Sequence, residues 1–184
     1  MSGVLSSLAA ADARVSERIH RAAMRLPQTR WVAALIAHTA DWWWWLIGAA
    51  AAWLAGGAWL AGDGHVRRPI VVVVATIVLT AVTVQSLKWI VRRERPPGER
   101  DFLSHHTDPH SFPSGHAARA VALTIVGGFL GPWWLGAALA PWAALVAGTR
   151  VVLAVHHLSD VIVGIAVGVL CGLAVVAWAT SGAA

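Results

Sequence analysis

Residues 69–91 read PIVVVVATIVLTAVTVQSLKWIV, and this stretch decides the fold class. Its apolar run is long enough to cross the hydrocarbon core of a bilayer as a helix, which takes about 20 residues. One charged residue, Lys88, stands near the end of the run. An ionisable side chain inside a membrane segment is costly and therefore usually functional. The stretch predicts a transmembrane helix that carries part of a functional site.

The composition of the whole chain agrees with a membrane protein. Of its 184 residues, 58% are hydrophobic and 12% are charged, against about 25% charged in an ordinary soluble domain. A soluble all-α protein would need amphipathic helices, and the long apolar runs have no polar face. We therefore expect an all-α fold, a polytopic membrane helix bundle with about five transmembrane helices in a single domain over residues 1–184. The predicted spans cover residues 42–62, 69–91, 114–130, 133–149 and 157–180.

Residues 1–30 form an N-terminal arm of different character, ahead of a helix bundle expected over about 40–180. Between residues 4 and 26 apolar side chains recur at roughly helical spacing, and arginines occupy other positions. This pattern is typical of an amphipathic helix in the membrane interface. A helical arm packed on the loops is the alternative. Pro27 is expected to break this helix, and residues 31–40 are expected to lead into the first span.

Several function classes are disfavoured by the same composition. The net charge of +5 does not indicate a nucleic-acid partner, because much of it lies in the N-terminal arm and in the polar segments described next. A single cysteine, Cys171, excludes a disulfide framework and a thiolate metal cluster.

The loop before the second polar segment described below is rich in histidine. His105, His106 and His110, near Asp101 and Asp108, could form a metal site, but we favour the interpretation that they are histidines at the mouth of another site. His38 and His65 have no partner pattern in the sequence.

Three short polar segments interrupt the apolar sequence, each at the end of a predicted span. They are K-x6-R-P at residues 88–96, P-S-G-H at 113–116 and R-x5-H-x3-D at 150–160. Short loops make consecutive spans alternate in direction, so all three segments are expected at the same membrane face. There they can form one site.

The first segment contributes two cations. Lys88 and Arg95 are seven residues apart, almost two helical turns, so we expect them on one helix face, with Pro96 ending the helix. Such a pair could bind a phosphate, Arg95 in a bidentate manner, or could snorkel to lipid headgroups. We interpret Arg92 and Arg93 as snorkelling cations.

The second segment opens an apolar helix. Pro113 suits a first helical turn, while Ser114 and Gly115 leave backbone N–H groups free at the positive helix end, which is an anion site. His116 lies just inside, where it can exchange a proton near neutral pH. A capped helix with an incidental histidine is the alternative.

The third segment contains a candidate nucleophile, a histidine. His156 and Asp160 are four residues apart and are expected to be neighbours on one helical face. A carboxylate that holds one imidazole nitrogen leaves the other as a nucleophile. Arg150 can clamp phosphoryl oxygens, and cations in that role make a metal unnecessary.

In order and spacing, these segments resemble the three-part signature of the type 2 phosphatidic acid phosphatase family, also called lipid phosphate phosphatases. The resemblance implies that His156 forms a phosphohistidine, that Asp160 orients it, and that His116 is the general acid and later the base. It implies no metal and no cofactor. Thr149 stands where the family commonly has serine, and it keeps the hydroxyl. The residues implied to hold the phosphoryl oxygens are Lys88, Arg95, Ser114, Gly115 and Arg150.

The resemblance further implies a lipid phosphate substrate and membrane lipids as partners. Polyprenyl pyrophosphate and phosphatidylglycerophosphate or phosphatidate are the main candidates, and an isoprenoid-linked sugar phosphate is a third. A non-catalytic phospholipid-binding or transport protein of the same fold is the alternative from another class of function.

We expect a multi-pass protein of the cell membrane. The arginines of residues 1–30 argue for a cytoplasmic site, whereas the precedent of the bacterial family members favours the extracytoplasmic face, which we adopt.

Overall fold

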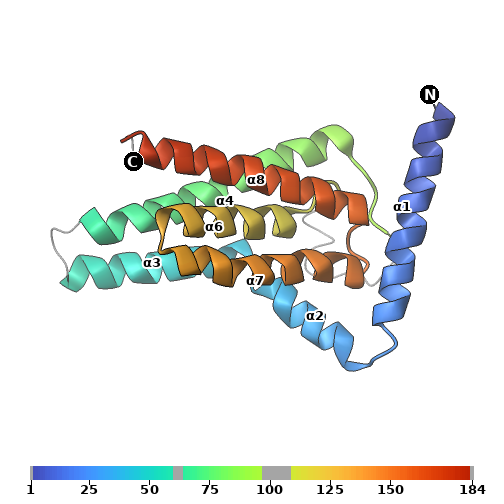
Figure 1. Ribbon diagram of the computed structural model, residues 1–184, viewed down its shortest axis with the longest axis horizontal. Helices are drawn as coiled ribbons and strands as arrows, with labels where there is room; N and C mark the ends of the chain where they lie inside the picture. The colour runs from blue at the N-terminus through green and yellow to red at the C-terminus, as the bar shows by residue number, and fades with distance from the viewer. Residues whose placement is uncertain (1, 60–63, 97–108, 183–184) are drawn as a thin grey trace.

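The computed structural model describes residues 2–59, 64–96 and 109–182, and the regular secondary structure of these residues is entirely α-helical (Figure 1). The expected all-α fold class is confirmed. The helices are α1 (Ser2–Ala23), α2 (Gln28–His38), α3 (Trp42–Trp59), α4 (Gly64–Val91), α6 (Gly115–Leu130), α7 (Trp133–Val152) and α8 (Leu158–Thr180).

Helices α3, α4, α6, α7 and α8 run side by side as a bundle, and α1 crosses one end of it (Figure 1). Helix α6 packs against α4, α7 and α8. Its buried face is rich in small residues, namely Ala117, Ala118, Ala120 and Ala122. The facing helix α8 presents Gly164 and Gly168, where an added Cβ would lie 2.5 Å and 2.4 Å from carbonyl oxygens of residues 114 and 118. Small residues on both helices therefore bring the two backbones close together, as in many membrane bundles.

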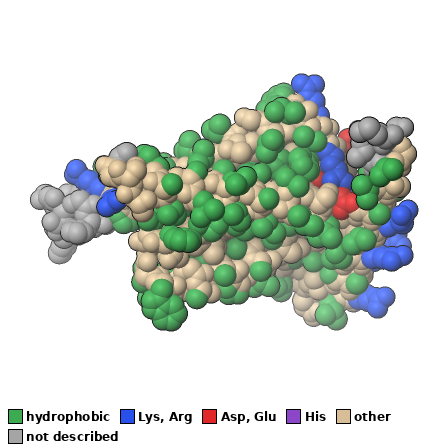
Figure 2. All heavy atoms as spheres, turned by 45° about the horizontal axis from the view of Figure 1, so that its top comes forward, with side chains coloured by type: hydrophobic (Ala, Val, Ile, Leu, Met, Phe, Trp, Pro, Cys, Tyr) green, Lys and Arg blue, Asp and Glu red, His purple; other side chains and the backbone are tan. Residues whose placement is uncertain are grey.

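The five bundle helices coincide with the five predicted spans to within a few residues. Three of them, α4 from Arg67, α7 and α8, are long and apolar enough to cross a membrane, and the 16-residue α6 is a shorter apolar helix. The tryptophan-rich α3 covers most of the first predicted span, whose last residues lie outside the described part of the chain. Figure 2 shows charged side chains mainly at the two ends of the molecule, with an apolar stretch between them. This distribution suits a bundle embedded in a bilayer.

The N-terminal arm forms α1, which ends at Ala23, ahead of Pro27. Its Val4, Leu8 and Val15 are exposed, as an interfacial helix requires. The same helix also packs on the bundle, since His20 Nδ1 lies 2.7 Å from the carbonyl oxygen of Val152. Helix α1 thus packs on the end of the bundle and leaves apolar side chains exposed, and its place in the membrane interface stays a prediction.

Residues 31–40, expected only as an approach to the first span, are mostly helical and belong to α2. The helix packs against α7 and buries Ala33 and Ala37. Ala40, just beyond its end, joins a core cluster with Ala120 and Val146. The helix was not predicted because its apolar face is short and made largely of alanine.

Candidate active site

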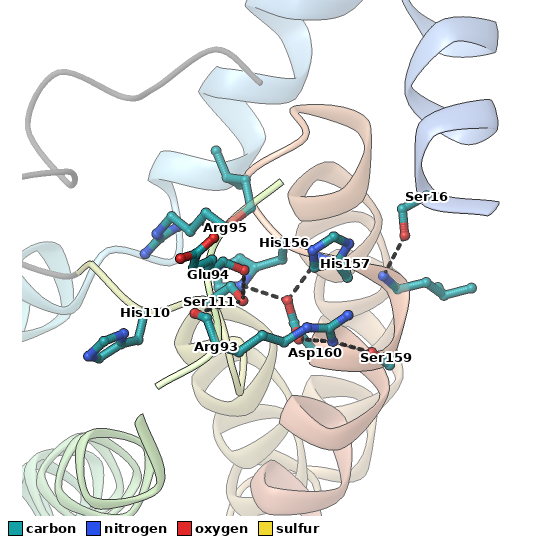
Figure 3. Close-up of polar contacts among 12 residues, drawn as sticks. Ser16, Arg93, Glu94, Arg95, His110, Ser111, His156, His157, Ser159 and Asp160 are labelled. Atoms are coloured by element: carbon teal, nitrogen blue, oxygen red, sulfur yellow. Dashed lines mark hydrogen bonds and ion pairs between the residues drawn. The ribbon is translucent and has the colours of Figure 1, made fainter. Parts of the chain in front are cut away.

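The three polar segments meet at the end of the bundle that α1 crosses, and Figure 3 shows side chains of the first and third segments there. Direct contacts join them in pairs. The Ser114 backbone N–H donates to the carbonyl oxygen of Asp160 at 2.9 Å, and Arg95 Nη1 donates to the carbonyl oxygen of Val155 at 3.1 Å. Segments separated by dozens of residues in the sequence thus form one site.

Lys88 and Arg95 reach this site from different backbone conformations. Helix α4 ends at Val91, because Arg92 adopts a left-handed conformation with φ of 50° and its N–H donates to the carbonyl oxygen of Lys88. Arg95 follows in a non-helical segment. The expectation that Lys88 and Arg95 share one helix face, with Pro96 ending the helix, is therefore wrong.

The segment that carries Arg95 is held by Ser111. The Ser111 backbone N–H donates to the carbonyl oxygen of Arg93 at 2.8 Å, and its hydroxyl donates to that of Glu94 at 2.9 Å. Lys88, only 2% exposed, donates from Nζ to the carbonyl oxygen of His110 at 2.9 Å. The residues just before P-S-G-H thus orient both the segment and the lysine.

Ser114 and Gly115 form the N-terminus of α6. Ser114 is the N-cap residue and Gly115 the first helical residue, so Pro113 precedes the cap and does not occupy the first turn. The Ser114 hydroxyl is fully buried and has no hydrogen-bond partner among the described residues. Leaving a buried hydroxyl unsatisfied costs about 1–3 kcal/mol. The Ser114 N–H, expected to be free, donates to the carbonyl oxygen of Asp160, so that part of the expectation is wrong. The Ser114 hydroxyl remains a donor at a positive helix end, which is suited to an anionic oxygen.

The five residues between Arg150 and His156 form a turn. Helix α7 ends at Val152, and Ala154 adopts a left-handed conformation with φ of 52°. The backbone N–H groups of Val155 and His156 then both donate to the carbonyl oxygen of Arg150, at 3.2 Å and 3.1 Å. The turn therefore returns the chain to Arg150 and sets His156 beside it.

His156 and Asp160 do not share a helical face, contrary to expectation, because α8 begins only at Leu158. Asp160 lies in the first turn of α8, where its Oδ2 accepts from the His157 backbone N–H at 2.8 Å. His156 Nδ1 lies 3.8 Å from the same oxygen, an ion-pair distance that exceeds a hydrogen bond. Both side chains are buried, at 2% and 0% exposed.

The electrostatic surroundings keep His156 neutral. Burial, together with the charges of Arg150, Arg95 and Lys88, lowers the pKa of the His156 imidazole to about 3, against the opposing effect of Asp160. Arg150 acts on His116 as well, so its charge reaches both histidines. At neutral pH the His156 imidazole therefore has a nitrogen lone pair available.

Arg93 is a site residue that the sequence did not reveal, and its interpretation as a snorkelling cation is wrong. Its Nη1 donates to Asp160 Oδ1 and to Ser159 Oγ, both at 2.6 Å (Figure 3). Its Nη2 donates to Asp12 Oδ2 at 2.8 Å. Burial would raise the pKa of Asp12, but hydrogen bonds from Ser159 and Arg93 hold it below its usual range. The position of Arg93 within the K-x6-R-P segment is the only signal in the sequence that could have pointed to it.

The remaining predicted residues have the following places. The Thr149 hydroxyl donates to the carbonyl oxygen of Val146 at 2.7 Å, within α7. In the part of the chain that the structure describes, no three His, Cys, Asp or Glu side chains are grouped as a metal ion would require. Residues 101, 105, 106 and 108, considered for a metal site, lie outside the described residues.

Residues 69–182, which include all three polar segments, match the model of the PAP2 superfamily. The chain belongs to this superfamily. Two solved structures have a similar fold, each at 22% sequence identity. A transmembrane PAP2 type phosphatidylglycerolphosphate phosphatase from Bacillus subtilis has a TM-score of 0.76, covering 95% of this chain and 87% of that one. LpxE from Aquifex aeolicus has a TM-score of 0.67, covering 88% and 92%. Both support a membrane helix bundle of the PAP2 type.

Proposed function

We propose that this PAP2 protein is a membrane phosphatase that hydrolyses a lipid phosphate or diphosphate through a phosphohistidine on His156. The observation that carries the proposal is the state of His156. Its imidazole is buried, is kept unprotonated by burial and three cations, and is fixed beside Arg150 by the turn. An unprotonated imidazole next to cations that bind phosphoryl oxygens is the arrangement that nucleophilic attack on phosphorus requires.

In the first half of the proposed reaction, a His156 nitrogen attacks phosphorus. The N–P bond forms as the P–O bond to the lipid breaks, and His116 gives its proton to the leaving lipid oxygen. In the second half a water molecule attacks the phosphohistidine. Its proton returns to His116, the O–P bond forms and the N–P bond breaks, which releases inorganic phosphate and restores both histidines.

Charge stabilisation is assigned to the chain's own cations and donors. Negative charge on the phosphoryl oxygens is spread over the equatorial positions in the transition state. Cations and hydrogen-bond donors already in place can stabilise that charge without reorganisation, so we propose that the reaction needs no metal ion. The residues assigned to this role are Lys88, Arg95, Ser114, Gly115 and Arg150.

The substrate is proposed to be an amphiphile whose phosphate lies at the level of the lipid headgroups. The site is at one end of a bundle with an apolar middle, next to an amphipathic helix. The similar fold of a phosphatidylglycerolphosphate phosphatase makes phosphatidylglycerophosphate or phosphatidate the first choice. Polyprenyl pyrophosphate is the second. We further propose a single domain in the cell membrane, with its site on the extracytoplasmic face.

The proposal is tested by measuring release of inorganic phosphate from a panel of lipid phosphates by the detergent-solubilised protein. We expect turnover in excess chelator, loss of turnover in His156→Ala, and a phosphoenzyme that is stable to alkali and labile to acid in the wild type. A strict requirement for magnesium would contradict the metal-free mechanism. Lipid binding without phosphate release from any member of the panel would favour the non-catalytic alternative.

A further inference from the structure

The structure pairs His116 with a carboxylate from a distant part of the chain. His116 Nε2 lies 2.7 Å from Oδ1 of Asp41, which stands between α2 and α3. Burial would raise the pKa of Asp41, but hydrogen bonds from His116 and His38 lower it to about 2. The carboxylate is thus ionised at neutral pH and can only accept, so Nε2 of His116 carries the hydrogen and donates it.

The position of Asp41 is fixed from several sides. Arg119, one turn along α6 from His116, donates from Nη1 to the carbonyl oxygen of Ala40 at 2.6 Å. Trp142 of α7 donates from Nε1 to the hydroxyl of Thr39 at 2.8 Å. These contacts hold residues 39–41 against α6 and α7, so the carboxylate faces His116 as part of the packed bundle.

We propose that Asp41 is a positioning residue for His116, holding its ring and stabilising the proton that His116 carries during the reaction. This inference rests on the proposed function. With Nε2 bonded to Asp41, Nδ1 is the nitrogen left to give a proton to the leaving lipid oxygen and later to take one from water. Asp41 stays ionised throughout, as does the orienting carboxylate of other histidine systems.

Other charged groups act around His116, and their signs explain why a carboxylate is needed. Arg119 on its own helix and Arg150 on α7 both place positive charge near the ring. Burial of the ring, together with these two charges, favours the neutral imidazole, whereas a general acid must be protonated. Among the described residues whose charges act on His116, Asp41 alone opposes them.

His38 offers a matched control. Its Nδ1 lies 2.8 Å from Oδ2 of Asp41, the oxygen that His116 does not use, and its side chain is 59% exposed. Removing His38 leaves the Asp41–His116 hydrogen bond intact, and exposed pairs of this kind contribute little. His38→Ala is therefore expected to change turnover by less than about threefold.

The experiment compares Asp41→Asn with the wild type. We expect kcat on an alkyl lipid phosphate to fall by about 10²-fold or more, by analogy with other orienting carboxylates. The alkaline limb of the kcat profile should move to lower pH, because the amide no longer stabilises protonated His116. With an activated aryl phosphate, whose leaving group needs no proton, the initial burst of phenolate should persist while steady-state turnover falls. Binding of inorganic vanadate reports that the phosphate site is still folded.

A double-mutant cycle separates positioning from a structural role. In a His116→Ala background, Asp41→Asn should cause little further loss, whereas a residue that only stabilises the bundle would cause the same loss in both backgrounds. If Asp41→Asn does not fold, Asp41→Ser takes its place, and the alkaline limb should again move to lower pH because the carboxylate is lost. An alkaline limb unchanged from the wild type in Asp41→Ser would overturn the role. If the wild type is active and Asp41→Asn has the same kinetics, only the role proposed for Asp41 is overturned. If the wild type is inactive, the proposed function is overturned as well.

Discussion

Arg93 Nη1 lies 2.6 Å from Oδ1 of Asp160, a fully buried carboxylate whose other oxygen accepts from the His157 backbone at 2.8 Å. The guanidinium also contacts Ser159 and Asp12. Asp160 is therefore held by a cation and a backbone N–H group, and it stands beside His156 at ion-pair distance. The carboxylate beside the proposed nucleophile thus belongs to a network that reaches α1.

Arg93→Gln should lower kcat by about 10- to 100-fold, because Asp160 loses the charged donor that fixes its position. Affinity for vanadate should change by less than about threefold, since Arg93 is not assigned to the phosphate oxygens. Arg92→Gln is the matched control: Arg92 is the exposed neighbour, and its Nε bonds only to the carbonyl oxygen of Trp89. Phosphate release by the two variants under identical conditions is the measurement. Equal turnover would mean that the His157 N–H alone positions Asp160.

Ser16→Ala should destabilise the N-terminus of α8. The Ser16 hydroxyl accepts the Leu158 backbone N–H at 2.9 Å, so α1 supplies a cap for the helix that carries Asp160. Loss of a capping hydroxyl costs about 1 kcal/mol. Thermal unfolding in detergent should show a Tm lower by a few degrees than that of Ser7→Ala. The Ser7 hydroxyl bonds only within α1, to the carbonyl oxygen of Val4. Indistinguishable Tm values would show that α1 docks without capping α8.

Gly164→Ala should be strongly destabilising and should reduce turnover. A Cβ at this position would lie 2.5 Å from the carbonyl oxygen of Ser114, so α8 and the N-terminus of α6 would have to separate. Gly148→Ala is the control, since nothing lies within 4 Å of its added Cβ and alanine is the better helix former. We expect Gly148→Ala to match or exceed the wild type in Tm. A Gly164→Ala variant as stable and active as Gly148→Ala would contradict the close α6–α8 packing.

Acid should destabilise the protein through His156. Its pKa is about 3 in the folded protein and about 6.5 in an unfolded chain. Between these values the unfolded chain binds a proton that the folded protein does not, so stability falls as pH falls from about 6.5 toward 3. His157 also has a pKa lowered by burial and adds in the same direction.

The prediction is checked by measuring Tm in detergent between pH 7 and pH 4 for the wild type and for His156→Gln. The Tm of the variant should depend less on pH over this range, because glutamine does not titrate. Parallel curves for the two proteins would mean that His156 is not held neutral in the folded state.

The helices of the bundle and the three polar segments were predictable because their signals are local. An apolar run of about 20 residues specifies a span by itself, and the predicted spans differ from α3, α4, α6, α7 and α8 by only a few residues where both are described. Local geometry was less predictable. Lys88 with Arg95 and His156 with Asp160 have helical spacing. Helix α4, however, ends before the left-handed Arg92, inside the first pair, and α8 begins only at Leu158, inside the second.

By itself, the sequence determined the membrane bundle, the order of its spans and the residues that meet at one end, since run length and motif spacing are properties of neighbouring residues. Only the tertiary structure decided which carboxylate lies beside His116 and which cation fixes Asp160. Arg93 and Asp160 are 67 positions apart, and Asp41 and His116 are 75 apart. No periodicity connects such pairs. They form because helix packing closes the bundle and because buried charges must find partners there.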